Sequence, residues 1–192
     1  MVEHSVVSIA EGLDGKRIAV TGSTGFLGTA LVERLLRSAP GCELVLLIRP
    51  GRRSDPTRRA KREIFRNDAF YRLRQSPGAE VHATLDRRGN AVPGDVGTDG
   101  LGLDDEGRAA FATADIVVHS AATVSFDSPL DAAVEVNLLG PPRIAAVLHE
   151  LGVTPHLVAV STCYVAGSRR GAAPEELVEE FRKCRDQVRA EP

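Results

Sequence analysis

The sequence has few aromatic side chains, and none of them is tryptophan. Phenylalanine and tyrosine together make up 4% of the 192 residues. Proteins that bind single-stranded nucleic acid stack the bases on aromatic side chains, and this chain has too few to build such a surface. The net charge of −2 provides no overall attraction to nucleic acid or to an anionic membrane. We therefore expect no nucleic-acid partner.

Cysteine is also scarce. The chain has three, Cys42, Cys163 and Cys184, and none forms a Cys-x-x-Cys pair or has a histidine at metal-ligand spacing. An odd, scattered set is typical of reduced thiols in the cytoplasm. No apolar run approaches the roughly 20 residues that span a bilayer, and the N-terminus lacks the apolar core of a signal peptide. These absences predict a cytoplasmic protein with no metal site, no disulfide framework and no transmembrane segment.

Short apolar runs alternate with longer stretches of helical periodicity. Apolar runs that predict buried strands cover residues 16–22, 43–48, 115–119 and 156–160. A weaker run over 91–96, interrupted by Pro93, predicts the third strand, with its end at Gly94-Asp95. Helical patterns cover residues 26–38 and 130–151, the second broken at Gly140-Pro141-Pro142. This alternation predicts an α/β protein with a Rossmann-like, doubly wound parallel sheet of strand order 3-2-1-4-5. Such sheets usually have about six or more strands, so we expect the sheet to be incomplete.

The most informative motif is TGSTGFLG, which follows an apolar strand and opens a helix. Gly22 permits a tight turn, Gly25 lets the backbone approach a pyrophosphate, and Gly28 lets the helix pack close to the sheet. The helix N-terminus offers unpaired N–H groups and the positive end of its dipole to phosphates. The alternative is a glycine-rich turn with a purely structural role. We interpret the motif as a cofactor site made of Thr21, Gly22, Ser23, Thr24, Gly25, Phe26, Leu27 and Gly28.

Arg49 follows the second strand, where NAD-binding proteins usually have an acidic residue that bonds the adenosine ribose. A guanidinium group suits a 2′-phosphate, so this position favours NADP (NADPH) over NAD. Arg52 and Arg53 follow, and no acidic residue occurs before Asp55. The alternative is a solvated loop. Basic residues continue to Arg74, as a solvated helix face or as a modest attraction for anionic phosphates.

Four further motifs occur in order along the chain: GDV at 94–96, HSAA at 119–122, NLLG at 137–140 and VSTCYVAG at 160–167. Together with TGSTGFLG and Arg49, they resemble those of the extended short-chain dehydrogenase/reductases. The segments GFLG, LIRP, HSAATVSFD and STCYVAG are similar to those of fatty acyl-coenzyme A reductases and of the reductase domains of carboxylic acid reductases. The resemblance implies an N-terminal extension over 1–14, an NADP-binding domain over 15–171, and a charged helical segment over 172–192 that leads into a missing C-terminal part.

The resemblance also assigns roles to residues outside the glycine turn. Asp95 would bond the adenine amino group, Val96 would give a backbone contact, and Ala121 and Ala122 would lie against the nicotinamide-side ribose and phosphates. Each has a structural alternative: Asp95 as the cap of a turn, and the alanines as small packing residues. Asn137 either contacts the cofactor or satisfies a backbone carbonyl within the fold.

Thr162, or Ser161 beside it, would hold the substrate carbonyl oxygen, although such a pair also caps turns. Catalysis in this family further needs a tyrosine with a lysine four residues later, and neither Tyr71 nor Tyr164 has one. The resemblance therefore implies that the full-length protein reduces a long-chain fatty acyl thioester to aldehyde or alcohol with NADPH, and that this chain alone is inactive. A lipid substrate is compatible with peripheral membrane contact. The alternatives are a sugar-nucleotide epimerase or dehydratase and a noncatalytic NADP-binding regulatory module.

Overall fold

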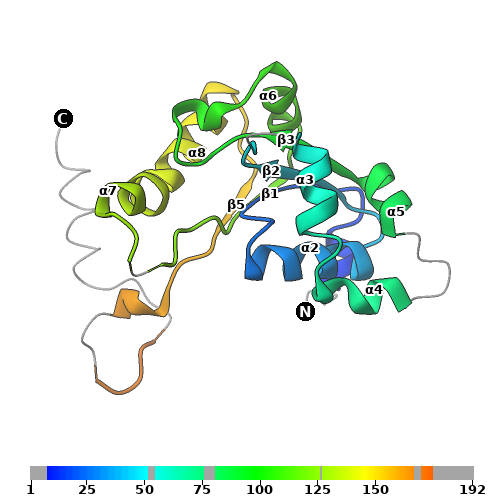
Figure 1. Ribbon diagram of the computed structural model, residues 1–192, viewed down its shortest axis with the longest axis horizontal. Helices are drawn as coiled ribbons and strands as arrows, with labels where there is room; N and C mark the ends of the chain where they lie inside the picture. The colour runs from blue at the N-terminus through cyan, green and yellow to red at the C-terminus, as the bar shows by residue number, and fades with distance from the viewer. Residues whose placement is uncertain (1–7, 52–54, 76–80, 126, 167–169, 175–192) are drawn as a thin grey trace, which may run out of the picture. The chain divides into compact units, whose positions relative to one another are not determined.

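A five-stranded parallel sheet lies at the centre of the protein, with strand order β3-β2-β1-β4-β5 (Figure 1). The computed structural model describes residues 8–51, 55–75, 81–125, 127–166 and 170–174. The strands are β1 (Arg17–Thr21), β2 (Glu43–Ile48), β3 (Gly89–Pro93), β4 (Ile116–His119) and β5 (His156–Ala159). Every neighbouring pair is parallel, which confirms the predicted fold class and strand order.

Helices connect the strands. The α-helices are α1 (Ile9–Gly12), α2 (Phe26–Ser38), α3 (Pro56–Glu63), α4 (Tyr71–Gln75), α5 (Val81–Arg88), α6 (Asp105–Ala112), α7 (Leu130–Ala133) and α8 (Gly140–Glu150). Shorter turns of 3-10 helix are η1 (Asp68–Phe70), η2 (Asp99–Gly102) and η4 (Cys163–Ala166), and η3 (Val134–Leu138) is a π-helical turn. The chain divides into two compact units, Met1–Val160 and Ser161–Pro192, and the whole sheet belongs to the first.

Alternate side chains of the central strands pack against helices on opposite faces of the sheet. On one face, residues such as Val20 and Leu46 contact a cluster that includes Val32 of α2 and Ile64 just after α3. On the other, residues such as Val117 pack with Phe111 of α6 and with α8. The apolar runs of β1 and β2 are buried because helices cover both faces, as predicted.

Three expectations need correction or refinement. All four residues of β5 are exposed, so the prediction of a strand buried on both faces is wrong for it; β5 lies at the edge of the sheet. The third strand, β3, begins at Gly89, two residues earlier than predicted, and ends at Pro93, just before the predicted end at Gly94-Asp95. The helical stretch over 130–151 does break at Gly140, where α8 begins with prolines in its first turn. Arg52, Arg53 and most of the charged segment over 172–192 lie outside the described residues.

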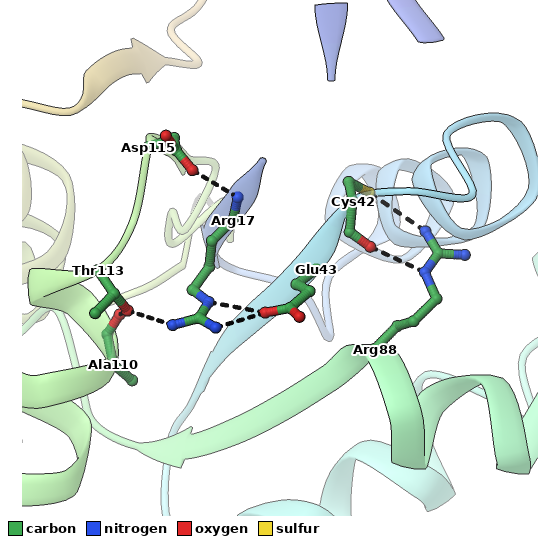
Figure 2. Close-up of polar contacts among 7 residues, drawn as sticks. All are labelled: Arg17, Cys42, Glu43, Arg88, Ala110, Thr113 and Asp115. Atoms are coloured by element: carbon green, nitrogen blue, oxygen red, sulfur yellow. Dashed lines mark hydrogen bonds and ion pairs between the residues drawn. The ribbon is translucent and has the colours of Figure 1, made fainter. Parts of the chain in front are cut away.

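At the amino ends of the strands, two arginines tie neighbouring elements together (Figure 2). The guanidinium group of Arg17 donates to Glu43 Oε2 at 2.6 and 3.0 Å and to Thr113 Oγ1 at 2.7 Å. The backbone N–H of Arg17 also donates to Asp115 Oδ2 at 2.8 Å, and Lys16 Nζ donates to Asp115 Oδ1 at 3.1 Å. These two hydrogen bonds lower the pKa of the Asp115 carboxyl. These contacts fix where β1, β2 and β4 begin relative to one another.

Arg88 has a different role, because it bonds backbone carbonyls. Its guanidinium group donates to the oxygens of Leu36, Ala39 and Cys42 at 2.9, 2.6 and 2.9 Å. The first two belong to the carboxyl end of α2, where the last carbonyls have no partner within the helix. Arg88 thereby caps α2 and joins it to the start of β3.

We predict that Arg88→Ala lowers the free energy of unfolding by about 2–4 kcal/mol, because it leaves several partly buried carbonyls without a donor. The matched control is Arg87→Ala, which removes the same charge from an exposed neighbouring position and should change stability by less than about 0.5 kcal/mol. Urea unfolding of both variants provides the measurement. Equal losses would show that Arg88 contributes only its charge.

Candidate functional site

A cleft of about 220 Å³ opens in the first compact unit, where β1, β2, β3 and β4 end. It is lined by Thr21, Gly22, Thr24, Gly25, Leu47, Arg49, Gly94, Asp95, Val96, Ser120, Ala121, Ala122, Thr123 and Val136. In open α/β sheets this carboxyl edge is where ligands bind. Nine residues singled out from the sequence thus meet in one place, although they come from four separate segments of the chain.

The glycine turn after β1 is packed so closely that side chains are excluded. Gly22 has a φ of 72°, and a Cβ atom there would lie 2.6 Å from the nitrogen of Ala121. A Cβ atom on Gly28 would lie 2.1 Å from the carbonyl oxygen of Gly22. The N–H of Gly25 donates to that same oxygen at 2.9 Å and closes the turn. The glycines therefore bring three backbone segments into contact.

Helix α2 begins at this turn without a side-chain cap. Gly25 is its N-cap residue, and the N–H of Thr29 is the first that bonds back, to Gly25 O at 2.9 Å. No described residue accepts a hydrogen bond from the N–H groups of Phe26, Leu27 or Gly28. The Phe26 side chain itself is 99% exposed. Unpaired N–H groups at the positive end of a helix dipole are an anion site.

Arg49 lies at the end of β2 and lines the same cleft. Its carbonyl oxygen accepts a hydrogen bond from the guanidinium group of Arg59 on α3, and Arg59 Nε donates to Glu63 Oε2 at 2.9 Å. Burial raises the pKa of Glu63, but hydrogen bonds from Arg62 and Arg59 outweigh this and hold the pKa below its usual value. Within the part of the chain that the structure describes, the guanidinium group of Arg49 has no partner. It is therefore a cation available to a ligand.

Asp95, which follows β3, is half-buried and lines the same cleft as the glycine turn. Its Oδ1 accepts from the N–H of Gly97 at 2.9 Å, and its own N–H donates to Leu101 O at 2.8 Å. One carboxylate oxygen thus caps a turn, which was the structural alternative. The described residues offer no hydrogen bond to Oδ2, so contact with an adenine amino group stays a prediction.

His119 is a residue of the site to which the sequence assigned no role. It ends β4, is 4% exposed, and its Nδ1 lies 2.7 Å from Thr21 Oγ1. Burial lowers the pKa of His119, so the imidazole is neutral at neutral pH. The available signal was its position at the start of HSAA, but the hydroxyl it meets is almost a hundred residues away in sequence.

Asn137 and Thr162 do not line the cleft. The side chain of Asn137, in η3, accepts from the N–H of Thr123 at 2.8 Å and donates to its carbonyl oxygen at 2.9 Å. This is the structural alternative for Asn137, and a cofactor contact stays a prediction. Thr162 belongs to the second compact unit, where its Oγ1 accepts from the N–H of Tyr164 at 3.2 Å. The substrate role of Thr162, or of the exposed Ser161, also stays a prediction.

Four predicted site residues belong to the turn or the start of α2 but do not line the cleft: Ser23, Phe26, Leu27 and Gly28. The Ser23 side chain is fully buried, and its hydroxyl has no hydrogen-bond partner among the described residues. Across the described ranges, no group of three or more His, Cys, Asp or Glu side chains could hold a metal ion. No helix in those ranges has both the length and the hydropathy to cross a bilayer.

The chain is similar in sequence to known proteins. The chain is 36% identical over 176 residues to "Probable fatty acyl-CoA reductase 5" of Arabidopsis thaliana, covering 88% of this chain and 36% of that protein. It is 33% identical over 172 residues to "Alcohol-forming fatty acyl-CoA reductase" of Simmondsia chinensis, covering 88% and 35%. It therefore spans about a third of the length of these relatives.

Among solved structures, the chain resembles the terminal R domain from the myxalamid PKS-NRPS biosynthetic pathway, with a TM-score of 0.66 and 26% identity over 86% of this chain and 40% of that one. The family described as "Male sterility protein" matches residues 20–191. These findings confirm the resemblance to the reductases of the extended short-chain dehydrogenase/reductase superfamily. The chain belongs to the Male sterility protein family and has the Rossmann-like fold of a domain that binds a nicotinamide dinucleotide.

Proposed function

We propose that this chain binds NADPH in the cleft and forms the cofactor half of a reductase for long-chain fatty acyl thioesters. The observation that carries the proposal is that a closed glycine turn, an uncapped helix N-terminus and an arginine without a partner among the described residues meet at one cleft. The turn and helix suit a pyrophosphate, and the arginine suits one further phosphate. When bound, the nicotinamide would supply the hydride.

Each wall of the cleft has a proposed part in binding. The N–H groups at the start of α2 would donate to the pyrophosphate, which the absence of a Cβ on Gly22 and Gly25 lets approach. Asp95 Oδ2 would accept from the adenine amino group, with Val96 beside it. Ala121 and Ala122 would leave room for the ribose on the nicotinamide side. An NADP-binding unit over residues 15–171 stays the proposal made from the sequence.

We propose that the guanidinium group of Arg49 binds the 2′-phosphate of NADPH. Arg59 supports this indirectly, because its hydrogen bond holds the Arg49 carbonyl oxygen, while the guanidinium group of Arg49 has no partner among the described residues. An acidic residue at this position would instead repel a phosphate and bond a ribose hydroxyl. The cation therefore favours NADPH over NADH.

The acyl thioester substrate is proposed from the relatives, whose names describe fatty acyl-CoA reductases. The Thr162 hydroxyl would donate to the carbonyl oxygen of that substrate. Reduction also needs a proton donor for this oxygen as the hydride arrives. The sequence has no tyrosine with a lysine four positions later, so we propose that this chain binds cofactor without turning over substrate.

Cofactor binding is tested by two glycine substitutions with the same backbone strain. Gly22→Ala should raise the Kd for NADPH at least about tenfold, because the new methyl group must displace the backbone at Ala121. Gly152→Ala is the matched control, since Gly152 has a φ of 68° but open space around it. Both variants should lose stability, and only the first should lose affinity in a fluorescence titration. Unchanged NADPH affinity in a folded Gly22→Ala variant would place the cofactor elsewhere.

Cofactor preference is tested at Arg49. Arg49→Ala should weaken NADPH binding about tenfold or more, since a charge-assisted hydrogen bond contributes roughly 1.5–3 kcal/mol, and should leave NADH binding nearly unchanged. Arg58→Ala, which removes an exposed cation of α3 outside the cleft lining, should affect neither cofactor by more than about twofold. Equal weakening of NADPH and NADH by Arg49→Ala would show that Arg49 does not read the 2′-phosphate.

Turnover is tested by NADPH oxidation with a long-chain acyl-coenzyme A. We expect none above background from this chain, because positioned acid–base catalysis alone contributes about 10²–10⁴-fold. The Simmondsia chinensis reductase at matched concentration serves as the positive control. Comparable turnover by this chain would mean that Tyr164 or another residue supplies the proton.

A further inference from the structure

The end of β1 and the end of β4 are joined by more polar contacts than a parallel pair of strands needs. Thr21 and His119 are the last residues of these strands and lie opposite each other in register. The Thr21 carbonyl oxygen accepts from the N–H of Ser120 at 3.3 Å and from its hydroxyl at 2.8 Å. The Thr21 hydroxyl contacts His119 Nδ1 at 2.7 Å and accepts from the N–H of Ala121 at 3.3 Å. The carbonyl oxygen and the hydroxyl oxygen of Thr21 are thus held by three consecutive residues at the end of β4.

We infer that His119 is a positioning residue for cofactor binding, because it holds the Thr21 hydroxyl and thereby sets the separation of the two turns that form the pyrophosphate end of the cleft. The inference rests on the proposed function, since it concerns the same cleft. His119 itself is absent from the cleft lining, so it acts through Thr21 and not by touching the ligand.

The geometry favours this role over that of an ordinary core histidine. Thr21 lines the cleft together with Gly22, the next residue. His119 is followed directly by Ser120 and Ala121, which also line it. Those walls are already in backbone contact, because a Cβ atom on Gly22 would lie 2.7 Å from the Cα of Ala121. A small change in the Thr21 position therefore moves the turn against its neighbour with no slack to absorb it.

The Thr21 hydroxyl has two partners, His119 Nδ1 and the N–H of Ala121. A threonine hydroxyl has one donor and two acceptor sites, so it can accept from the N–H of Ala121 and still bond the imidazole. Thr21 is fully buried and His119 nearly so, and water cannot replace either partner without opening the site. Removing the hydroxyl leaves both the N–H of Ala121 and His119 Nδ1 without their partner.

The test compares isosteric and conservative variants of both residues. Thr21→Val removes the hydroxyl at constant shape, and His119→Phe removes the ring nitrogens; each should raise the Kd for NADPH about five- to tenfold. Thr21→Ser keeps the hydroxyl, and His119→Asn keeps a polar atom near the position of Nδ1, so each should recover most of the affinity lost by the variant without that polar group. The double variant Thr21→Val with His119→Phe should bind no more weakly than the weaker single variant, because the two act as one unit.

Unfolding curves recorded beside the titrations separate positioning from folding. Kd values are measured at a temperature at which each variant is folded; if His119→Phe does not fold, the Thr21→Val and Thr21→Ser pair decides. The inference is overturned if Thr21→Val loses stability but binds NADPH as tightly as Thr21→Ser, or if the single-variant losses simply add. Failure of the parent chain to bind NADPH at all would instead overturn the proposed function.

Discussion

The close approach of two backbone segments, the turn after β1 and the segment after β4, is the constraint on which the rest of the site depends. Gly22 and Ala121 meet at a distance that no side chain on Gly22 could occupy. This contact leaves the start of α2 beside the end of β4, and the first three N–H groups of α2 have no partner among the described residues. The cleft is therefore a product of backbone packing, and the side chains around it adjust charge and fit.

The two ends of the sheet are built from different interactions. At the amino ends of the strands, the guanidinium group of Arg17 donates to Glu43, and that of Arg88 donates to backbone carbonyl groups (Figure 2). At the carboxyl ends, donors at the start of α2 and the cation of Arg49 have no partner among the described residues. The donors without a described partner thus lie at the carboxyl edge, which is where ligands usually bind in open α/β sheets.

The sequence alone predicted much of this arrangement because its strongest signals are local. The spacing within TGSTGFLG determines turn, helix start and strand end together. This motif and the alternation of strands with helices predicted the strand order of a doubly wound sheet. The exposure of β5 could not be predicted from its apolar composition, since burial depends on what lies beside an edge strand. The start of β3 was also misplaced, because Pro93 obscured a strand that ends at that residue.

Long-range side-chain contacts account for what the sequence could not give within the site. The two hydrogen bonds between Asn137 and the backbone of Thr123, and the contact of His119 with Thr21, join residues whose spacing has no characteristic period. Thr162 was identified by its motif alone, and the structure describes it within a separate compact unit. Local patterns thus located the cleft, and tertiary structure revealed how its walls are held.

A crystal structure of this chain with NADP⁺ tests the account most directly. We expect the pyrophosphate oxygens within hydrogen-bond distance of the N–H groups of Phe26 and Leu27. We also expect the 2′-phosphate to contact the guanidinium group of Arg49. A dinucleotide bound on another surface, or one in this cleft with its phosphates directed away from the start of α2, would contradict it.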